Sequence, residues 1–202
     1  MSREVIFSIF AEEEGGGYLK WRNFRDKVSR PFCDFFHKHG ITHNHLSYLG
    51  LAMVIPFIYF FGFNPWLSYI FILLNLFFDS LDGPMARFSG KASTRGAVVD
   101  IMFDHLSFFI IFLTFLYFGL LNPFWGSVYL VNYVIMLAFI IFCRGLRIKF
   151  FPVIRSKYYV YMVFFIWLMT GQNYFDPFLV CFSFYMFATN FFLFDRIKCS
   201  LP

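Results

Sequence analysis

The sequence predicts an all-α polytopic membrane protein, a six-helix transmembrane bundle with an amphipathic helix at the membrane interface before it. Of its 202 residues, 59% are hydrophobic and only 14% are charged, whereas soluble domains carry about 25% charged residues. Apolar runs near the ~20 residues that a bilayer requires recur along the chain. Basic residues occur only in alternate connections between these runs. A water-soluble core of this size cannot hide so much apolar surface, which excludes a soluble globular domain.

The length indicates one main domain. We expect residues 1–40 to form a cytoplasmic tail and a juxtamembrane helix, and residues 41–202 to form the six-span membrane domain that carries the function. The four cysteines are widely scattered and include no C-x-x-C pair. They are interpreted as reduced thiols that pack as small hydrophobic side chains.

The segment before the first span has the pattern of an interfacial amphipathic helix. Trp21, Phe24, Val28, Phe32 and Phe35 are three or four residues apart and share one helical face. The charged residues fall mostly on other faces: Arg22, Arg25, Asp26, Lys27 and Arg30. A basic and aromatic helix of this kind lies in the interface with its cations toward anionic lipid headgroups.

Three further residues are expected to affect where the helices of this region begin and end. Pro31 is expected to kink or restart the helix, Gly40 to end it, and Asn44 to cap the first span. Four histidines lie within nine residues of one another: His37, His39, His43 and His45. A zinc site is one interpretation, but without paired cysteines or a rigid spacing, contacts with lipid headgroups are favoured.

Six apolar runs are predicted to cross the membrane, and the fifth is shorter than the others. They are Leu46–Phe63, Trp66–Asp82, Ala97–Leu121, Phe124–Cys143, Tyr158–Gly171 and Pro177–Phe194. The connections after the first, third and fifth runs contain no lysine or arginine, and all 17 basic residues fall on the other side. The positive-inside rule therefore predicts a multi-pass protein with both termini in the cytoplasm.

Two pairs of aspartates interrupt the second and third runs. Asp79 and Asp82 are three residues apart, and Asp100 and Asp104 are four apart, so each pair shares a helical face. The short connection predicts antiparallel helices, which brings both pairs together at the cytoplasmic end. One ionised aspartate at mid-helix already costs about 2.5–3.5 kcal/mol on insertion scales. Arg87 supplies a single nearby positive charge.

A divalent cation explains these four carboxylates economically. Hard oxygen ligands without neighbouring cysteines favour Mg²⁺ or Mn²⁺ over zinc, and shared carboxylates are suited to holding two ions around a phosphoryl group. Helix capping or pairing with Arg87 accounts for one or two of the aspartates but not for four. On physical grounds alone, a metal-ion or proton transporter remains an alternative, because intramembrane carboxylates also mark ion pathways.

The spacing resembles the signature of the CDP-alcohol phosphotransferase family, D-x2-D-G-x2-A-R-x8-G-x3-D-x3-D. Each of its eight fixed positions is present: Asp79, Asp82, Gly83, Ala86, Arg87, Gly96, Asp100 and Asp104. The six-span layout and the basic helix before it agree with the same family. The resemblance implies a membrane transferase of phospholipid biosynthesis. The distribution of basic residues predicts that its active site lies on the cytoplasmic side.

The resemblance also implies roles for individual residues. Asp79, Asp82 and Asp100 correspond to metal ligands. Asp104 corresponds to a ligand that is also the base for the acceptor hydroxyl, although a ligand-only role stays open. The resemblance assigns Gly96 to close helix contact. It places two of the metal ligands, the other matched positions and three residues outside the signature in the nucleotide or donor pocket. These donor-pocket positions are Asp79, Asp82, Gly83, Ala86, Arg87, Ser93, Thr42 and Asn44.

The family commonly begins its first span with Thr-Pro-Asn, where this chain has Thr42, His43 and Asn44. That departure weakens the assignment of Thr42 and Asn44 to the nucleotide pocket.

The resemblance predicts transfer of a substituted phosphate, a phosphatidyl group, from a CDP-linked lipid to an alcohol, with release of CMP. Basic residues follow the fourth span and are predicted to bind a phosphorylated polyol such as glycerol 3-phosphate or inositol phosphate. These residues are Arg144, Arg147, Lys149, Arg155 and Lys157. A phosphotransferase of the CDP-choline or CDP-ethanolamine type, or a serine-accepting relative, is the alternative. The expected partners are the donor, the acceptor and membrane lipids; no nucleic acid is expected, and a homodimer is allowed.

Overall fold

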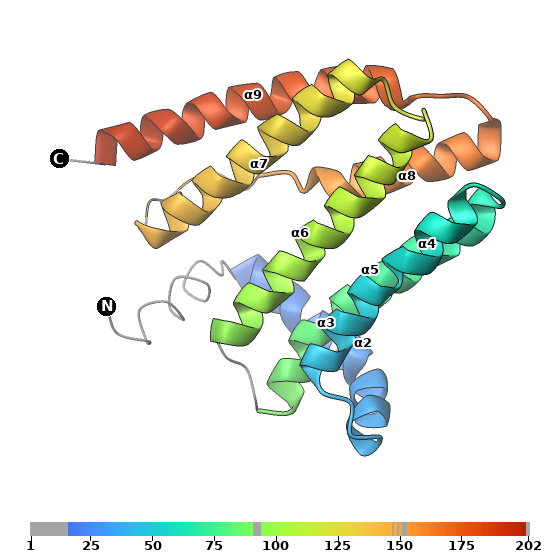
Figure 1. Ribbon diagram of the computed structural model, residues 1–202. Helices are drawn as coiled ribbons and strands as arrows, with labels where there is room; N and C mark the ends of the chain where they lie inside the picture. The colour runs from blue at the N-terminus through green and yellow to red at the C-terminus, as the bar shows by residue number, and fades with distance from the viewer. Residues whose placement is uncertain (1–15, 91–93, 147, 149, 151–152, 201–202) are drawn as a thin grey trace. The chain divides into compact units, whose positions relative to one another are not determined.

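A computed structural model of the chain describes residues 16–90, 94–146, 148, 150 and 153–200. Within these residues the regular structure is entirely α-helical, which confirms the predicted all-α class (Figure 1). The chain forms two compact units, Met1–Phe112 and Leu113–Pro202. Helix α6 (Thr94–Tyr117) contributes residues to both of them.

The first unit is organised around the long helix α5, on which α2, α3 and α4 pack (Figure 1). Its helices are α2 (Gly16–Lys38), α3 (His43–Ala52), α4 (Val54–Phe61) and α5 (Pro65–Phe88), followed by the start of α6. Cys33, Leu46, Leu81 and Met85 form a buried cluster that joins α2, α3 and α5. This cluster fixes the end of α5 that carries the aspartates.

The helix ends of the first unit follow local chemistry. Gly40, with φ of 72°, closes the turn after α2, as predicted for a helix stop. The prediction that Asn44 caps the next helix is wrong, because Thr42 is the N-cap residue of α3. His45 explains the difference, since its Nδ1 accepts a hydrogen bond from the Thr42 backbone N–H at 3.3 Å. His45 thus occupies the position that Glu or Gln takes in a capping box.

Helix α2 keeps the predicted amphipathic pattern. Phe24, Val28, Phe32 and Phe35 are between 44% and 58% exposed, which leaves an apolar face available to lipid. The side chain of Trp21 lies outside the described residues. Pro31 does not restart the helix, because α2 is continuous from Gly16 to Lys38.

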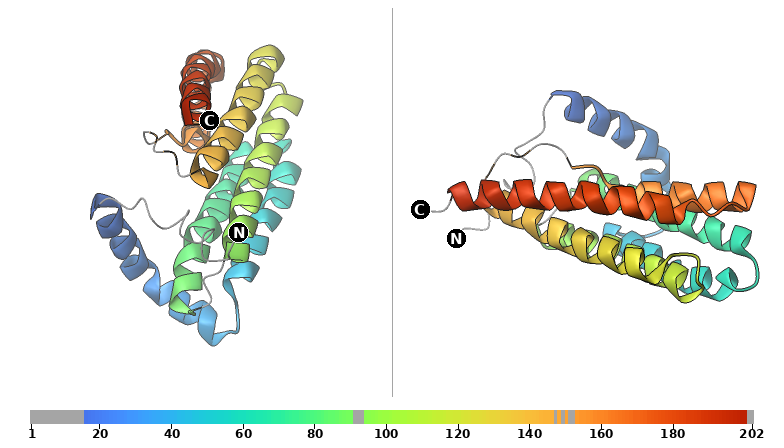
Figure 2. Two further views of the ribbon diagram at one scale, coloured as in Figure 1. Left: turned by 90° about the vertical axis from the view of Figure 1, so that its left-hand side faces the viewer. Right: turned by 90° about the horizontal axis from the view of Figure 1, so that it is seen from above.

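The second unit is built on the pairing of α7 (Pro123–Gly145) with α9 (Phe175–Ser200), which lie side by side (Figure 2). The amide of Asn190 donates to the Asn132 backbone carbonyl at 3.1 Å and links the two helices. Helix α8 (Ser156–Thr170) contacts α9 and ends at Gly171, whose φ is 69°.

Five helical segments of the described chain are long and apolar enough to cross a membrane, which supports an integral multi-pass protein. They are His43–Phe61, Pro65–Phe88, Val98–Tyr117, Pro123–Cys143 and Phe175–Ser200. The predicted fifth span corresponds to α8, which has only 15 residues. At 1.5 Å per residue α8 is about 22 Å long, shorter than the hydrocarbon core of about 30 Å.

Candidate functional site

Three of the four predicted aspartates meet in the first unit. Asp79 and Asp82 lie on successive turns of α5, and Asp100 lies on α6. One carboxylate oxygen from each lies within 4.8 Å of the other two. Asp104, one turn further along α6, lines the same small cavity of about 10 Å³. The helical spacing in the sequence therefore brings the predicted carboxylates to one place.

Asp82 is the most deeply placed of the three, with 5% of its surface exposed. The Ser47 hydroxyl of α3 donates to Asp82 Oδ2 at 3.1 Å, and the Gly83 backbone N–H donates to Oδ1 at 2.6 Å. The Asn75 amide fixes α3 against α5 by donating to the Gly50 carbonyl at 2.8 Å. These contacts orient the Asp82 carboxylate but bring no positive charge to it.

The donor set fits a hard divalent cation. Three carboxylates this close repel one another, and burial strengthens the repulsion. Mg²⁺ binds oxygen at about 2.0–2.1 Å in octahedral geometry, which places its ligand atoms about 3–4 Å apart. The 4.8 Å limit on the three carboxylates accommodates that geometry. Among the described residues this cluster contains oxygen ligands only, which disfavours zinc.

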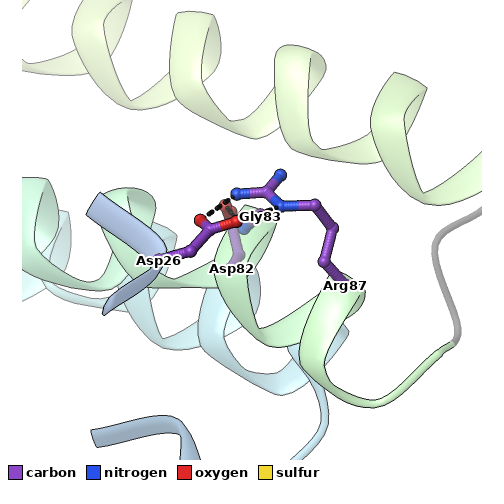
Figure 3. Close-up of polar contacts among 4 residues, drawn as sticks. All are labelled: Asp26, Asp82, Gly83 and Arg87. Carbon is purple, nitrogen blue, oxygen red and sulfur yellow. Dashed lines mark hydrogen bonds and ion pairs between the residues drawn. The ribbon is translucent and has the colours of Figure 1, made fainter. Parts of the chain in front are cut away.

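Gly83 follows Asp82 on α5, and the Arg87 guanidinium approaches Gly83 near helix α2 (Figure 3). The Arg87 guanidinium is held by the Asp26 carboxylate in a two-pronged ion pair, with Nε 2.9 Å from Oδ2 and Nη2 2.5 Å from Oδ1. A guanidinium held in this way presents its remaining nitrogen in a fixed direction.

The other predicted donor-pocket residues are less concentrated. Thr42 is the N-cap residue of α3, and Asn44 is exposed on its first turn. Ala86 and Gly96 are partly buried on α5 and α6. Ser93 lies outside the described residues.

The predicted acceptor residues belong to the second unit. Arg147 and Lys149 lie outside the described residues, as does the side chain of Arg144. Arg155 is exposed at the start of α8, whereas Lys157 is only 3% exposed and its Nζ lies 4.9 Å from the centre of the Tyr158 ring. Lys157 therefore does not present its charge freely to lipid headgroups.

Four residues near the site were missed from the sequence: Ser47, Asn75, Arg25 and Asp26. Asn75 had a usable signal, because it precedes Asp79 by four residues and shares its helical face. Ser47 is a single hydroxyl in an apolar run and had none. Arg25 and Asp26 were visible only as members of a charged helix face. Their contact with residues about 60 positions later has no local pattern.

Cys33 and the clustered histidines also lie in this region. Cys33 is 2% exposed, and its burial, together with the charges of Asp26 and Asp34, raises the pKa of its thiol despite the opposing effect of Arg87. A protonated thiol is a poor nucleophile. In the clustered histidines, His39 Nδ1 lies 2.8 Å from the Phe35 carbonyl oxygen, and the His37 ring packs edge-on against Phe88. No metal-ligand group forms among these histidines in the described part of the chain.

Comparisons with known proteins agree with this geometry. The family profile described as CDP-alcohol phosphatidyltransferase matches residues 41–194. An archaetidylinositol phosphate synthase from Pyrococcus horikoshii is 38% identical over 69 residues, which are 34% of this chain and 37% of that protein. No solved structure matches the chain. Because the profile covers most of the chain, including all four aspartates, this protein belongs to the CDP-alcohol phosphatidyltransferase family.

Proposed function

We propose that this protein transfers a phosphatidyl group from a CDP-linked lipid to the hydroxyl of an alcohol and releases CMP, as a step of phospholipid biosynthesis. The cluster of Asp79, Asp82 and Asp100, with Asp104 at the same cavity, is the observation that carries the proposal. Carboxylates clustered within apolar helices suit a reaction in which the substrate is itself a phosphate held through a cation.

In the proposed reaction, the acceptor oxygen bonds to the phosphorus that carries the lipid, and the bond from that phosphorus to CMP breaks. Asp104 takes the proton of the acceptor hydroxyl, while CMP leaves with the electron pair. Asp104 suits this role because it lines the cavity but stands apart from the group of three carboxylates. The enzyme contributes mainly positioning and charge neutralisation, as in other phosphoryl transfers.

Asp79, Asp82 and Asp100 would hold Mg²⁺ or Mn²⁺. A cation bound there supplies positive charge that stabilises the phosphate oxygens of the leaving CMP. The cavity of about 10 Å³ has room for about one water-sized occupant. A second ion would use Asp104 as an additional ligand, and metal analysis of the purified protein measures the stoichiometry.

We further propose that the acceptor is a phosphorylated polyol. The relative named archaetidylinositol phosphate synthase supports this choice, within the short stretch that it shares with the chain. The basic residues from the end of α7 to the start of α8 also support it, since two arginines three residues apart suit a phosphate dianion. Free serine or a neutral diacylglycerol would not need them.

The decisive experiment measures CMP release by purified protein in lipid nanodiscs. CDP-diacylglycerol is supplied with glycerol 3-phosphate, inositol phosphate or serine as the acceptor. We expect CMP and a phosphorylated lipid product, complete loss of both with a chelator, and recovery with Mg²⁺ or Mn²⁺. Full activity in a thoroughly chelated sample would remove the metal role. Ion flux in vesicles without CMP release would favour a transporter instead.

We propose that both termini and the aspartates face the cytoplasm. The support comes from the connections 62–64, 118–122 and 171–174, which contain no lysine or arginine. In a background without native cysteines, a cysteine at Gln172 should react with an impermeant reagent outside intact cells, and one at Lys38 should not. The opposite labelling pattern would reverse the orientation.

A further inference from the structure

Helix α2 lies outside the matched family region, which begins at residue 41, yet it packs directly on the aspartate-bearing part of α5. Phe32 meets Phe77 edge-on at 5.4 Å between ring centres, and His37 meets Phe88 at 5.7 Å. Cys33 is buried in the same cluster as Leu81 and Met85. These contacts place the charged face of α2 over the first turn after Asp82.

Two arginines from different helices converge on Gly83. A Cβ atom placed on Gly83 would lie 3.5 Å from Arg87 Nη1 and 3.8 Å from Arg25 Nη2. The Asp26 carboxylate occupies Nε and Nη2 of Arg87, so Nη1 is the nitrogen that faces Gly83. Two guanidinium edges therefore approach the one position of this turn that has no side chain.

Arg25 has bonding capacity that the protein itself does not use. Its Nε is buried and makes no hydrogen bond within the described part of the chain. A buried guanidinium nitrogen without an acceptor is unfavourable, and a bound oxyanion would supply that acceptor. Asp82, a member of the carboxylate cluster, immediately precedes Gly83, so such an anion would lie beside the proposed cation site.

The surrounding charge also favours an anion. A cavity of about 290 Å³ beside Arg87 is lined by three cations, Lys27, Arg30 and Arg87, against the single carboxylate of Asp26. Excess positive charge in a partly enclosed site attracts phosphate groups, and guanidinium groups bind them with two parallel hydrogen bonds. The shared chemistry of the ligand is therefore a phosphate, which a nucleotide or a lipid headgroup can provide.

We propose that Arg25 and Arg87 bind a phosphate of the CDP-linked donor over Gly83, and that Asp26 is the positioning residue for Arg87. The N-terminal helix then completes the donor site rather than serving only as a membrane anchor. This inference rests on the proposed function, because it takes the donor to be a CDP-linked lipid. The donor is favoured over a lipid headgroup because the two guanidinium groups meet next to Asp82.

The first test compares Arg25→Gln with Lys38→Gln, which removes the same charge from the exposed end of the same helix. Arg25→Gln should raise the KM for CDP-diacylglycerol about 10- to 150-fold, the effect of losing one charge-assisted contact. The KM for the acceptor should stay unchanged, and Lys38→Gln should behave as wild type. Arg25→Lys keeps the charge but loses the planar fork, so an intermediate KM is expected. An unchanged donor KM in Arg25→Gln would overturn the proposal.

A second variant, Gly83→Ala, tests whether a phosphate occupies the space over Gly83. The Cβ of Gly83→Ala would make only ordinary van der Waals contacts, so the protein should fold with unchanged or higher thermal stability. The same methyl group would occupy the place between the two guanidinium groups, so the donor KM should rise. Wild-type donor KM in a stably folded Gly83→Ala protein would show that no phosphate binds there.

Asp26 is tested by a charge-neutral and a conservative variant. Asp26→Asn should raise the donor KM with little change in kcat, whereas Asp26→Glu, which keeps the carboxylate, should have a donor KM close to that of the wild type. A purely structural role for Asp26 would not change KM and kcat separately. Asp34→Asn serves as the control on the same helix. Equal effects of Asp26→Asn and Asp34→Asn would reject the positioning role.

Two further arms separate the sources of phosphate and the two proposals. Each variant is assayed in neutral nanodiscs and in nanodiscs with anionic lipid; an Arg25 effect confined to anionic nanodiscs would assign the site to a lipid headgroup and overturn the donor assignment. Equilibrium binding of CDP to the wild-type and Arg25→Gln proteins needs no turnover. If the wild type released no CMP, the proposed function would fail, while weaker CDP binding by Arg25→Gln would still support the phosphate site. Equal CDP binding by the two proteins would reject it.

Discussion

Both compact units bury neutral polar side chains, and they differ in the charged side chain that each buries: Asp82 in the first unit and Lys157 in the second. In the first unit a buried carboxylate, Asp82, lies with Asp79 and Asp100 and receives hydrogen bonds that leave its charge uncompensated. The second unit contains hydrogen bonds between neutral side chains: buried Asn190 bonds to Asn132, and the Tyr129 hydroxyl bonds to Ser156 at 2.7 Å. Neutral hydrogen-bonded pairs within apolar helices stabilise helix packing. Clustered carboxylates are unfavourable there unless a cation binds them, and such clusters mark functional sites.

The contrast assigns different tasks to the units. The first unit holds unfavourable charges together by fixing α3 and α2 on α5, and such arrangements mark sites of chemistry. The second unit uses amide and hydroxyl contacts to hold α7 against α9. Lys157 is the exception, a cation in the second unit with only 3% exposure and a ring of Tyr158 beside it. Under the proposed function, Lys157 is one of the basic residues assigned to binding the acceptor.

The largest expected effect is the loss of catalysis on neutralising one carboxylate of the first unit. Asp82→Asn should lower CMP release more than about 100-fold, because even second-shell changes at metal sites cost about 10–100-fold. The amide oxygen can still accept from Ser47, so the fold should persist. With chelator present, the variant should melt at the same or a higher temperature than wild type, because one of three repelling charges is gone.

Asp195→Asn is the matched control, since Asp195 is exposed on α9. Near wild-type turnover in Asp82→Asn would contradict the metal-ligand role of Asp82. A large loss of thermal stability in this variant would mean that its lower activity reflects unfolding. The same assays on Asp79→Asn and Asp100→Asn show whether the three carboxylates act as one group.

A smaller effect is expected from the arginines that follow the body of α7. Arg144→Gln and Arg147→Gln should each raise the acceptor KM about 10- to 150-fold and leave the donor KM nearly unchanged. Lys198→Gln, at the exposed end of α9, is the control. This result would support the proposal that the first unit binds the donor and the cation and that residues of the second unit determine acceptor specificity. An unchanged acceptor KM in both variants, or a preference for serine, would end the anion-acceptor proposal but not the family assignment.

The sequence predicted the part of this architecture that depends on short-range spacing. The proximity of Asp79, Asp82 and Asp100 could be predicted because helical periodicity and one short connection determine their relative positions. The sequence analysis predicted Asn44 as the cap of α3, whereas Thr42 is the N-cap residue, because the position of the cap depends on where the His45 ring accepts a hydrogen bond. The amphipathic pattern of α2 predicted the side on which its apolar residues are exposed. It carried no information on the opposite side, where Asp26 meets Arg87 across 61 residues of chain.

The smallest expected effect concerns the neutral pair of the second unit. Asn190→Ala removes both hydrogen bonds to Asn132, and such contacts within membrane helices average about 0.6 kcal/mol, with a maximum near 1.7 kcal/mol. We expect a slightly lower melting temperature and unchanged CMP release per folded molecule. Ser183→Ala on the same helix is a sharp control, because the Ser183 hydroxyl is buried and has no hydrogen-bond partner in the described chain. Its removal should leave stability unchanged or raise it, since an unpaired buried hydroxyl is unfavourable. If Asn190→Ala instead abolished CMP release without lowering the melting temperature, the second unit's polar pair would belong to the chemistry, and the contrast between charged and neutral burial would not separate the two tasks.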